Sequence, residues 1–312
     1  MFKISIIIPV KNGSATLERC LESITSQQEV VIEEIIILDS ASSDTSILIA
    51  ERFGAKIISI KPYTFNHGLT RNVPVQHAAG NLLFYTVQDA SLSDRMLLNK
   101  MATYFYDDSV MAVCGHQAVP HEKDKNPRLW YHRFTDPIPE FRQWKPGKPM
   151  PAYSWDNVVA MYRKSALEQL PFEQTDTTED WIWAYAALKK EWRIVYDPAI
   201  VVWHYHHRTF KYILRSDFSV YYTLFKNFGT LPRRTGWLKR NATDIYHLLN
   251  HKELTVNEKI KWIIHNFNAN TATSLTAILF KLTKLISNQK GLDFLYRKLC
   301  FHIPQGRQNL SI

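Results

Sequence analysis

The chain has 312 residues, 46% of them hydrophobic and 21% charged, which is the composition of a globular protein. It contains no run of about 18 apolar residues, and Met1 to Ile4 enters a strand pattern without a small-residue cleavage site, so we expect neither a membrane-spanning helix nor a signal peptide. The scattered Cys20, Cys114 and Cys300 exclude a disulfide framework and a standard zinc spacing, and they indicate buried thiols in a reducing compartment.

The basic character lies in the C-terminal third. Residues 205–312 hold 17 Lys and Arg against 5 Asp and Glu, a net charge of +12. The totals of 38 and 29 leave 21 against 24, or −3, for residues 1–204. Such a region attracts nucleic acid, anionic lipid or a pyrophosphate-linked molecule, although it can also be a merely solvated surface.

Three short apolar runs at residues 4–10, 35–39 and 56–60 read as buried strands. Helix patterns lie between them, with Ser14 and Asp44 as expected N-caps. A β-α-β-α-β series predicts a parallel, doubly wound sheet.

The segment 65–72 precedes the next strand. Gly68 allows a tight turn, and a helix should run from there to about residue 79 with Arg71 in its first turn. The helix dipole disfavours a cation at that position, which indicates an anion nearby. An ordinary exposed arginine is the alternative.

Residues 82–87 read as a fully buried strand that stops at Gln88 and Asp89. A carboxylate at the C-terminal end of a strand lies where open α/β sheets bind ligands. Asp39 closes the 35–39 strand in the same way. The alternative for Asp89 is capping of the helix expected over 93–106.

A strand at 110–115 is followed by residues 118–151, which carry seven prolines and no periodicity. An irregular insertion of this length is usually functional or mobile. Its aromatic residues could stack on a sugar or fix the loop to the core. They are Trp130, Tyr131, Phe134, Phe141 and Trp144.

After a strand at 155–162 and a helix at 164–170, Thr177 or Thr178 should cap a helix running to residue 190. Glu179 and Asp180 fall in its first turn, either as caps or as a general base. Residues 192–196 and 199–203 read as paired strands. Three histidines follow within residues 204–207, where they could bind a metal or pack as neutral polar groups.

The remaining chain is helical. Apolar residues recur at steps of three and four between Leu214 and Phe228 and between Leu275 and Ile286, with Lys281 and Lys284 off the second stripe. Basic amphipathic helices of this kind can lie on a membrane surface, and packing of the stripes on the protein is the alternative.

The ordered set of motifs resembles family 2 glycosyltransferases with the GT-A fold, over about residues 3–208. The matching stretches are residues 6–13, 39–44, 88–90, 179–180 and His204. Residues 65–72 together with 88–90 resemble the rhamnosyltransferase branch. The resemblance implies an α/β GT-A fold, with a mostly parallel sheet flanked by helices in a catalytic domain at 1–208. A basic helical region at 209–312 would then associate with the membrane or the acceptor.

By the same resemblance, Pro9, Val10 and Asn12 would line a nucleotide-sugar site, and Asp39 would bond the edge of the pyrimidine base. Arg71 would face the diphosphate.

Asp89 would bind a divalent cation, Mg²⁺ or Mn²⁺, in a site completed by His204. Asp180 would be the catalytic base, with Glu179 beside it. The family's metal motif usually carries an Asp at both its first and last positions, and here the first is replaced by the neutral Gln88 or its neighbour Val87. One fewer anionic ligand should weaken cation binding.

The implied function is inverting transfer of one sugar, L-rhamnose from dTDP-L-rhamnose, to a glycan on a polyprenyl pyrophosphate in cell-surface polysaccharide (O-antigen) biosynthesis. The enzyme would be cytoplasmic and peripheral to an anionic membrane surface, with no nucleic acid partner. The Gln-x-x-Arg-Trp pattern of processive synthases is absent, so we expect transfer of a single residue.

Three alternatives remain. The first is a hexosyltransferase using a UDP-sugar. The second is a nucleotidyltransferase, which would need a Gly-rich phosphate loop that Lys11-Asn12-Gly13 does not supply. The third is a non-enzymatic basic module that binds membrane or nucleic acid.

Overall fold

A computed structural model describes residues 2–61, 64–130, 137–231 and 235–299. The chain forms two compact units. Among the described residues, the sheet unit takes in 2–118 and 137–205, and the helical unit takes in 119–130 and 206–299. The domain boundary predicted at residue 208 stays a prediction.

The sheet unit is built on one mixed sheet with the strand order β3-β2-β1-β4-β8-β6-β9-β5, and β7 pairs with β9. Strands β3, β2, β1 and β4 are mutually parallel, β8 runs antiparallel to β4 and β6, and β9 is parallel to β6. The strands are β1 Lys3–Val10, β2 Val31–Asp39, β3 Lys56–Ser59, β4 Leu82–Tyr85, β5 Ser91–Leu92, β6 Val110–Ala118, β7 Glu140–Arg142, β8 Ala160–Arg163 and β9 Arg193–Trp203.

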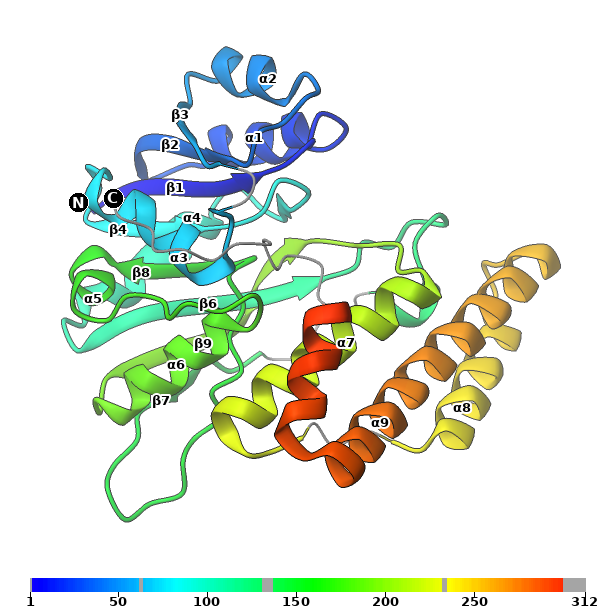
Figure 1. Cartoon of the computed structure of the whole chain (residues 1–312). Coiled ribbons are helices and arrows are strands. Elements are labelled where there is room, and N and C mark those ends of the chain that lie inside the picture. The colour runs from blue at the N-terminus through cyan, green and yellow to red at the C-terminus, as the bar shows by residue number, and fades with distance from the viewer. Residues whose placement is uncertain (1, 62–63, 131–136, 232–234, 300–312) are drawn as a thin grey trace. The chain divides into compact units, whose positions relative to one another are not determined.

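Helices cover both faces of this sheet (Figure 1). Ile4, Ile6 and Ile8 of β1 pack with α1, α2 and α4, while Ile7 points to the opposite face, which α5 and α6 cover. Side chains alternate along a strand, so a strand buried on both faces needs the continuous apolar run that was predicted. The helices are α1 Leu17–Thr25, α2 Ser46–Arg52, α3 His67–Asn72, α4 Leu97–Thr103, α5 Lys164–Gln169 and α6 Glu179–Lys189.

The predicted position of Arg71 in a helix was wrong. Helix α3 starts at His67, and the side chain of Asn66 accepts the Leu69 N–H at 3.0 Å as the cap. Arg71 therefore lies in the last turn, where the helix dipole favours a cation. The helix ends at Asn72 and a 3₁₀ turn with Pro74 follows, since proline lacks the N–H that a longer helix needs.

The two strands predicted at 192–196 and 199–203 are one strand, β9. Its pairing with β6 shifts between Cys114 and His116, so Asp197–Ile200 bulges out of the ladder. Pro198 sits in this bulge, where no ladder N–H is required.

Three expected caps also differ. Thr16, not Ser14, precedes α1, and Thr45, not Asp44, precedes α2. Met96 precedes α4, which excludes capping of that helix by Asp89.

The helical unit contains α7 Phe210–Phe228, α8 Trp237–Leu249 and α9 Val256–Leu299, with a break in helical geometry at Asn288. Helices α7 and α9 share the core residues Phe218, Tyr221, Tyr222, Phe280, Leu292 and Tyr296. No helix in the described ranges has the length and apolarity needed to cross a membrane.

The insertion predicted as irregular is split between the units. Trp130 is buried in the helical unit with Leu248, Leu254 and Trp262, next to a short 3₁₀ helix at Pro127–Leu129. In the sheet unit, Phe141 lies in β7 and Trp144 packs against the core. Tyr131 and Phe134 lie outside the described residues.

Candidate active site

The predicted residues of the sheet unit gather at one edge of the sheet. Val10 and Asp39 end the neighbouring parallel strands β1 and β2 and lie opposite each other. Asp89 follows β4, and His204 follows β9 directly. The carboxyl ends of strands in an open α/β sheet form the usual ligand crevice.

The loops after β1 and β2 are joined by hydrogen bonds. Asn12, in a left-handed conformation with φ of 50°, donates its N–H to Ser42 Oγ at 2.9 Å and accepts the Ser43 N–H at 2.8 Å. Both oxygens of the buried Asp39 accept the Ser42 N–H, at 3.1 and 3.2 Å. This arrangement fixes the backbone after Pro9 and Val10 before any ligand arrives.

Gln88 links the loop after β4 to the loop after β1. Its Oε1 accepts the Lys11 N–H at 2.8 Å and its Nε2 donates to the Lys11 carbonyl at 3.3 Å. A Cβ on Gly13 would lie 2.7 Å from Gln88 Oε1, so only glycine allows this approach. An amide can both donate and accept here, whereas an ionised carboxylate can only accept, so this pair of hydrogen bonds gives a physical reason for glutamine rather than glutamate at position 88.

Asp89 and His204 form the candidate metal site. Asp89 Oδ1 lies 3.4 Å from His204 Nε2, and both side chains are largely buried. His204 Nδ1 lies 2.7 Å from Gln117 Oε1, an acceptor, so Nδ1 is the donor of that bond and Nε2 is the ring nitrogen that faces Asp89. A carboxylate and an imidazole oriented by a second group are a donor set that suits Mn²⁺ or Mg²⁺ with further oxygen ligands.

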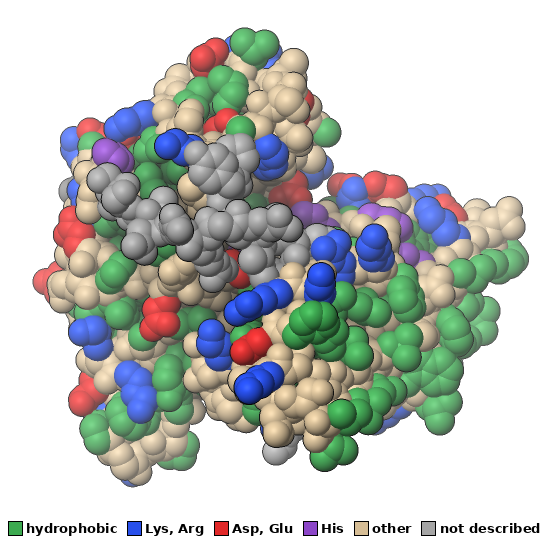
Figure 2. All heavy atoms as spheres, viewed as in Figure 1, with side chains coloured by type: hydrophobic (Ala, Val, Ile, Leu, Met, Phe, Trp, Pro, Cys, Tyr) green, Lys and Arg blue, Asp and Glu red, His purple; other side chains and the backbone are tan. Residues whose placement is uncertain are grey.

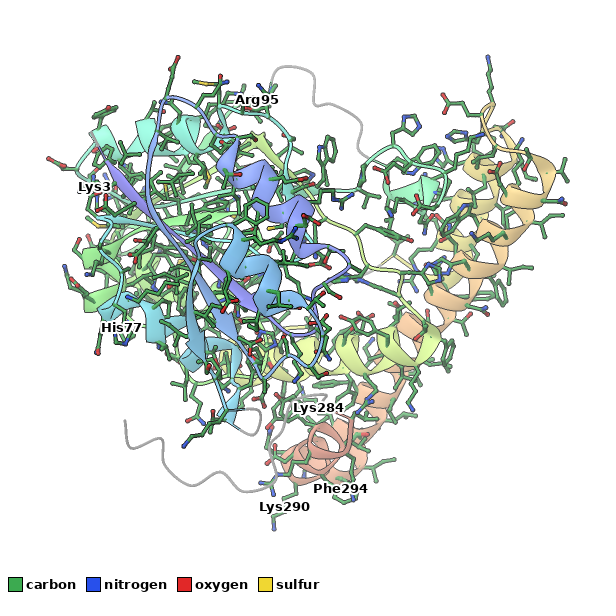
Figure 3. The ribbon with its side chains drawn as sticks, turned by 90° about the horizontal axis from the view of Figure 1, so that it is seen from above. Lys3, His77, Arg95, Lys284, Lys290 and Phe294 are labelled. Atoms are coloured by element: carbon green, nitrogen blue, oxygen red, sulfur yellow. The ribbon has the colours of Figure 1, made fainter. Side chains whose placement is uncertain are left out.

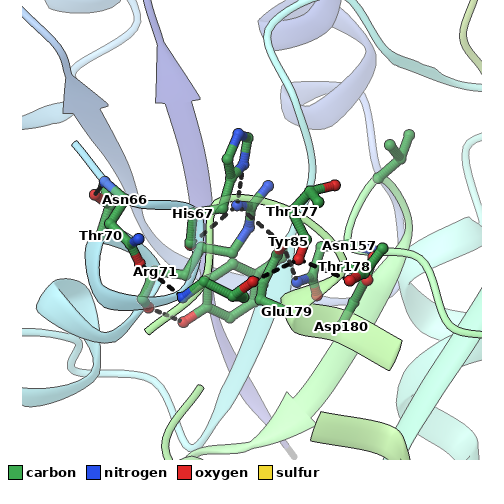
Figure 4. Close-up of polar contacts among 12 residues, drawn as sticks. Asn66, His67, Thr70, Arg71, Tyr85, Asn157, Thr177, Thr178, Glu179 and Asp180 are labelled. Carbon is green, nitrogen blue, oxygen red and sulfur yellow. Dashed lines mark hydrogen bonds and ion pairs between the residues drawn. The ribbon is translucent and has the colours of Figure 1, made fainter. Parts of the chain in front are cut away.

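Arg71 and Glu179 form a buried ion pair (Figure 4). Arg71 NH1 lies 3.0 Å from Glu179 Oε1, with side chains only 7% and 5% exposed. The same nitrogen lies 3.2 Å from His67 Nδ1, while Arg71 Nε is buried without an acceptor among the described residues. Burial alone would raise the pKa of Glu179, but Arg71, His67 and a hydrogen bond from Asn157 hold that pKa below its ordinary value.

Asn157 connects the two adjacent carboxylates of α6. Its Nδ2 donates to Glu179 Oε1 at 3.1 Å, and its backbone N–H donates to Asp180 Oδ2 at 3.2 Å. Its Oδ1 accepts from Tyr162 at 2.6 Å, which fixes the amide orientation. Burial, then the charges of Glu179 and Asp156, raise the pKa of Asp180 well above its ordinary value. The two neighbouring carboxyl groups therefore differ in pKa: Glu179 is ionised, and Asp180 holds a proton more tightly. Such a difference is found in many acid–base sites.

Asp156 interacts electrostatically both with His204 of the candidate metal site and with Glu179 of the carboxylate pair. Burial raises its pKa, His204 lowers that pKa and Glu179 raises it, so Asp156 interacts with both groups. Thr86 Oγ1, just after β4, donates to the Val158 carbonyl at 2.9 Å and ties this turn to the strand end.

A family model described as Glycosyl transferase family 2 matches residues 5–170, more than half of the chain. The chain belongs to family 2 of the glycosyltransferases. Its GT-A fold is shared with solved structures at TM-scores above 0.5.

Two curated relatives of this family 2 glycosyltransferase match along most of their length. The O-antigen chain rhamnosyltransferase RfbN of Salmonella typhimurium is 29% identical over 247 residues, 77% of this chain and 75% of the relative. WbaN of Salmonella anatum, with the same description, is 28% identical over 76% of this chain and 74% of its own.

Among solved structures, the mannosyltransferase PcManGT from Pyrobaculum calidifontis, in complex with GDP-Man and Mn²⁺, has a TM-score of 0.54 at 15% identity. It covers 95% of this chain and 79% of its own. S. aureus TarS has a TM-score of 0.55 at 15% identity and covers 95% of this chain and 90% of its own.

Sequence reasoning on this glycosyltransferase missed Asn157, Asp156 and Gln117. Residues 155–162 read as a strand, but β8 starts only at Ala160 and a turn precedes it. The polar pair Asp156-Asn157 inside an apolar run was the available signal, since such a pair does not suit a buried strand. The sequence around Gln117 gave no such signal, because its partner His204 lies 87 residues away.

Proposed function

We propose that this enzyme transfers L-rhamnose from dTDP-L-rhamnose to a glycan acceptor with inversion at the anomeric carbon. The observation that carries the proposal is the similarity to two O-antigen chain rhamnosyltransferases, which spans about three quarters of both partners and exceeds the family match in length.

In the proposed reaction, Asp180 accepts the proton of the acceptor hydroxyl. The acceptor oxygen forms a bond to the anomeric carbon, the bond from that carbon to the diphosphate oxygen breaks, and the nucleoside diphosphate leaves with the electron pair. A single in-line displacement inverts the centre. The raised pKa of Asp180 supports its role, because a carboxylate with a higher proton affinity is a stronger base once it is ionised.

Glu179 and Asn157 would hold this base in place. Asn157 donates to both carboxylates, and the ionised Glu179 contributes to the high proton affinity of Asp180. Arg71 neutralises Glu179, and its buried Nε supports a second task in facing the donor diphosphate.

We also propose that Asp89 and His204 hold Mg²⁺ or Mn²⁺. The cation would neutralise charge on the leaving diphosphate. Solved relatives with Mn²⁺ support this, namely PcManGT with GDP-Man and the glucosyl-3-phosphoglycerate synthase of Mycobacterium tuberculosis with UDP. Pro9, Val10, Asn12, Asp39 and Gln88 would line the nucleotide end of the site.

The acceptor proposed here is a glycan on a polyprenyl pyrophosphate at the inner face of the membrane. Residues 1–208 would carry catalysis and residues 209–312 would hold the enzyme at the membrane. The net charge of +12 on residues 205–312 supports this assignment.

Donor binding and hydrolysis across dTDP-rhamnose, UDP-glucose, UDP-galactose, UDP-GlcNAc and GDP-mannose, each with Mg²⁺, Mn²⁺ or EDTA, tests the proposal. We expect a response to dTDP-rhamnose that EDTA removes. A response to a UDP-sugar alone would replace the rhamnosyl donor with a hexosyl one. The Asp180→Asn variant should bind donor and lose turnover, and normal turnover would remove Asp180 from the mechanism.

A further inference from the structure

The exposed face of α9 carries an apolar stripe. Between Val256 and Ile286, nine large hydrophobic side chains are exposed to solvent, mostly at steps of three or four residues, with an interval of small and polar residues between Phe267 and Leu275. They include Val256, Ile260, Ile264, Ile278, Leu282 and Leu285. We call this set the α9 stripe; over this span a helix extends roughly 45 Å.

The α9 stripe is not the packing face of the helix. The residues that α9 buries lie on its opposite side, among them Trp262, Thr276 and Phe280. Leu285 and Ile286 are 80% and 77% exposed. The sequence left two possibilities for Leu275 to Ile286, contact with a membrane or packing on the protein. Leu279 packs on the protein, and its exposed neighbours do not.

Helix α8 widens the same surface. It packs on α9 and exposes Leu238, Ile245, Tyr246 and Leu249. Trp237 of α8 contacts Phe267, an exposed α9 residue, with ring centroids 5.4 Å apart. Figure 2 shows hydrophobic side chains gathered along α8 and α9. Large groups of exposed apolar side chains usually mark a surface that meets a partner.

Lysines border the surface. Residues 256–286 contain Lys259, Lys261, Lys281 and Lys284 against the single acidic residue Glu258, a net charge of +3. Figure 3 shows Lys284, Lys290 and Phe294 on the C-terminal part of α9. Phe294 is exposed and Lys298 lies over its ring at 5.9 Å.

We propose that the α9 stripe and the exposed face of α8 dock flat into the headgroup region of an anionic lipid bilayer. The apolar side chains of the stripe would contact the lipid acyl chains, and the lysines beside them would contact the lipid phosphates. A second copy of the chain fits less well, because two such surfaces packed together would bring their lysine borders close to each other. The inference extends the proposed function by naming the surface that meets the membrane.

Co-sedimentation of the full chain with vesicles tests this. We expect binding to vesicles of equal parts phosphatidylcholine and phosphatidylglycerol, and little to phosphatidylcholine alone. The variant Ile278→Ser/Leu282→Ser/Leu285→Ser should lose affinity by about a thousandfold, since each of the three buried side chains contributes roughly tenfold. Lys281→Glu should weaken binding and reduce its salt dependence. Leu48→Ser, a substitution on α2 at a 62% exposed leucine, is the matched control and should bind like the parent chain.

Equal binding of the triple variant and the parent chain would overturn the proposal. So would absence of vesicle binding, or a dimer in analytical ultracentrifugation that the triple variant dissociates, which would assign the surface to a second copy. Circular dichroism and donor hydrolysis without vesicles should match between the triple variant and the parent chain. Vesicle binding therefore tests lipid docking, donor hydrolysis tests sugar transfer, and either proposal can fail without the other.

Discussion

Removal of the positive charge of Arg71, which pairs with Glu179, should destabilise the sheet unit. In Arg71→Met, the Glu179 carboxylate loses a partner at 3.0 Å while remaining buried. At an effective dielectric constant of about 20, that attraction amounts to about 5 kcal/mol, most of it offset by the desolvation of both groups. Leaving one charge buried without its partner costs about 3–5 kcal/mol. For a unit of this size, the melting temperature should fall by about 10 °C.

The loss should depend on pH. In the parent chain the pKa of Glu179 is lowered, so its ionised form adds stability above the ordinary glutamate range, and this is lost as pH falls through the lowered pKa. In Arg71→Met, burial acts without Arg71 and raises the pKa, so the variant loses stability as pH rises above the ordinary range. The difference between the two proteins should be widest near neutral pH and narrow towards about pH 5.

Thermal unfolding of the parent and variant chains at both pH values measures this difference. Arg52→Met is the matched control, because Arg52 pairs with Glu18 at 2.9 Å with side chains 61% and 49% exposed, and it should cost less than about 1 kcal/mol. The double variant Arg71→Met/Glu179→Gln should be more stable than Arg71→Met alone, since no buried charge remains. Equal losses for Arg71→Met and Arg52→Met, or a double variant no more stable than the single, would refute the reasoning.

Three further outcomes are expected. The acid limb of kcat/KM against pH should lie above the ordinary aspartate range, because the pKa of Asp180 is raised and activity is lost as pH falls through it; in Glu179→Gln the limb should move to lower pH, and an unmoved limb would contradict the coupling. Gln88→Glu should lower stability by about 0.5–1.5 kcal/mol in urea unfolding, because a carboxylate cannot donate to the Lys11 carbonyl; unchanged stability would exclude the role assigned to that bond. Gln117→Ala should weaken Mn²⁺ binding by about 10–100-fold in calorimetry by freeing the His204 ring, and unchanged affinity would place the cation elsewhere.

The parts of the fold that follow from local patterns were predicted correctly. The apolar runs of β1, β2 and β4 are long enough to identify buried parallel strands, and the spacing of Leu17, Cys20, Leu21 and Ile24 marks the buried face of α1. The resemblance supplied the family and the GT-A fold, which the comparisons confirm. The roles given to the individual site residues stay predictions.

The errors came from partners far away in the sequence. Residues 192–196 and 199–203 read as two strands because the bulge between them, opposite Gly115, cannot be seen locally. A Cβ on Gly115 would lie 2.5 Å from the Ile200 carbonyl oxygen. Arg71 read as a cation at a helix start, whereas it lies in the last turn of α3 and pairs with Glu179, more than a hundred residues later. Ion pairs across such separations are set by the tertiary fold.

The way the chain is divided bears on how the protein is made. Trp130 belongs to the helical unit, yet Leu248, Leu254 and Trp262, which bury it, come more than a hundred residues later. At the usual speed of translation the ribosome needs roughly ten seconds to deliver them. During that interval Trp130 and its neighbours lack their native contacts, so we expect a chaperone to bind residues 119–130. A chain cut after residue 205 would keep that segment exposed permanently.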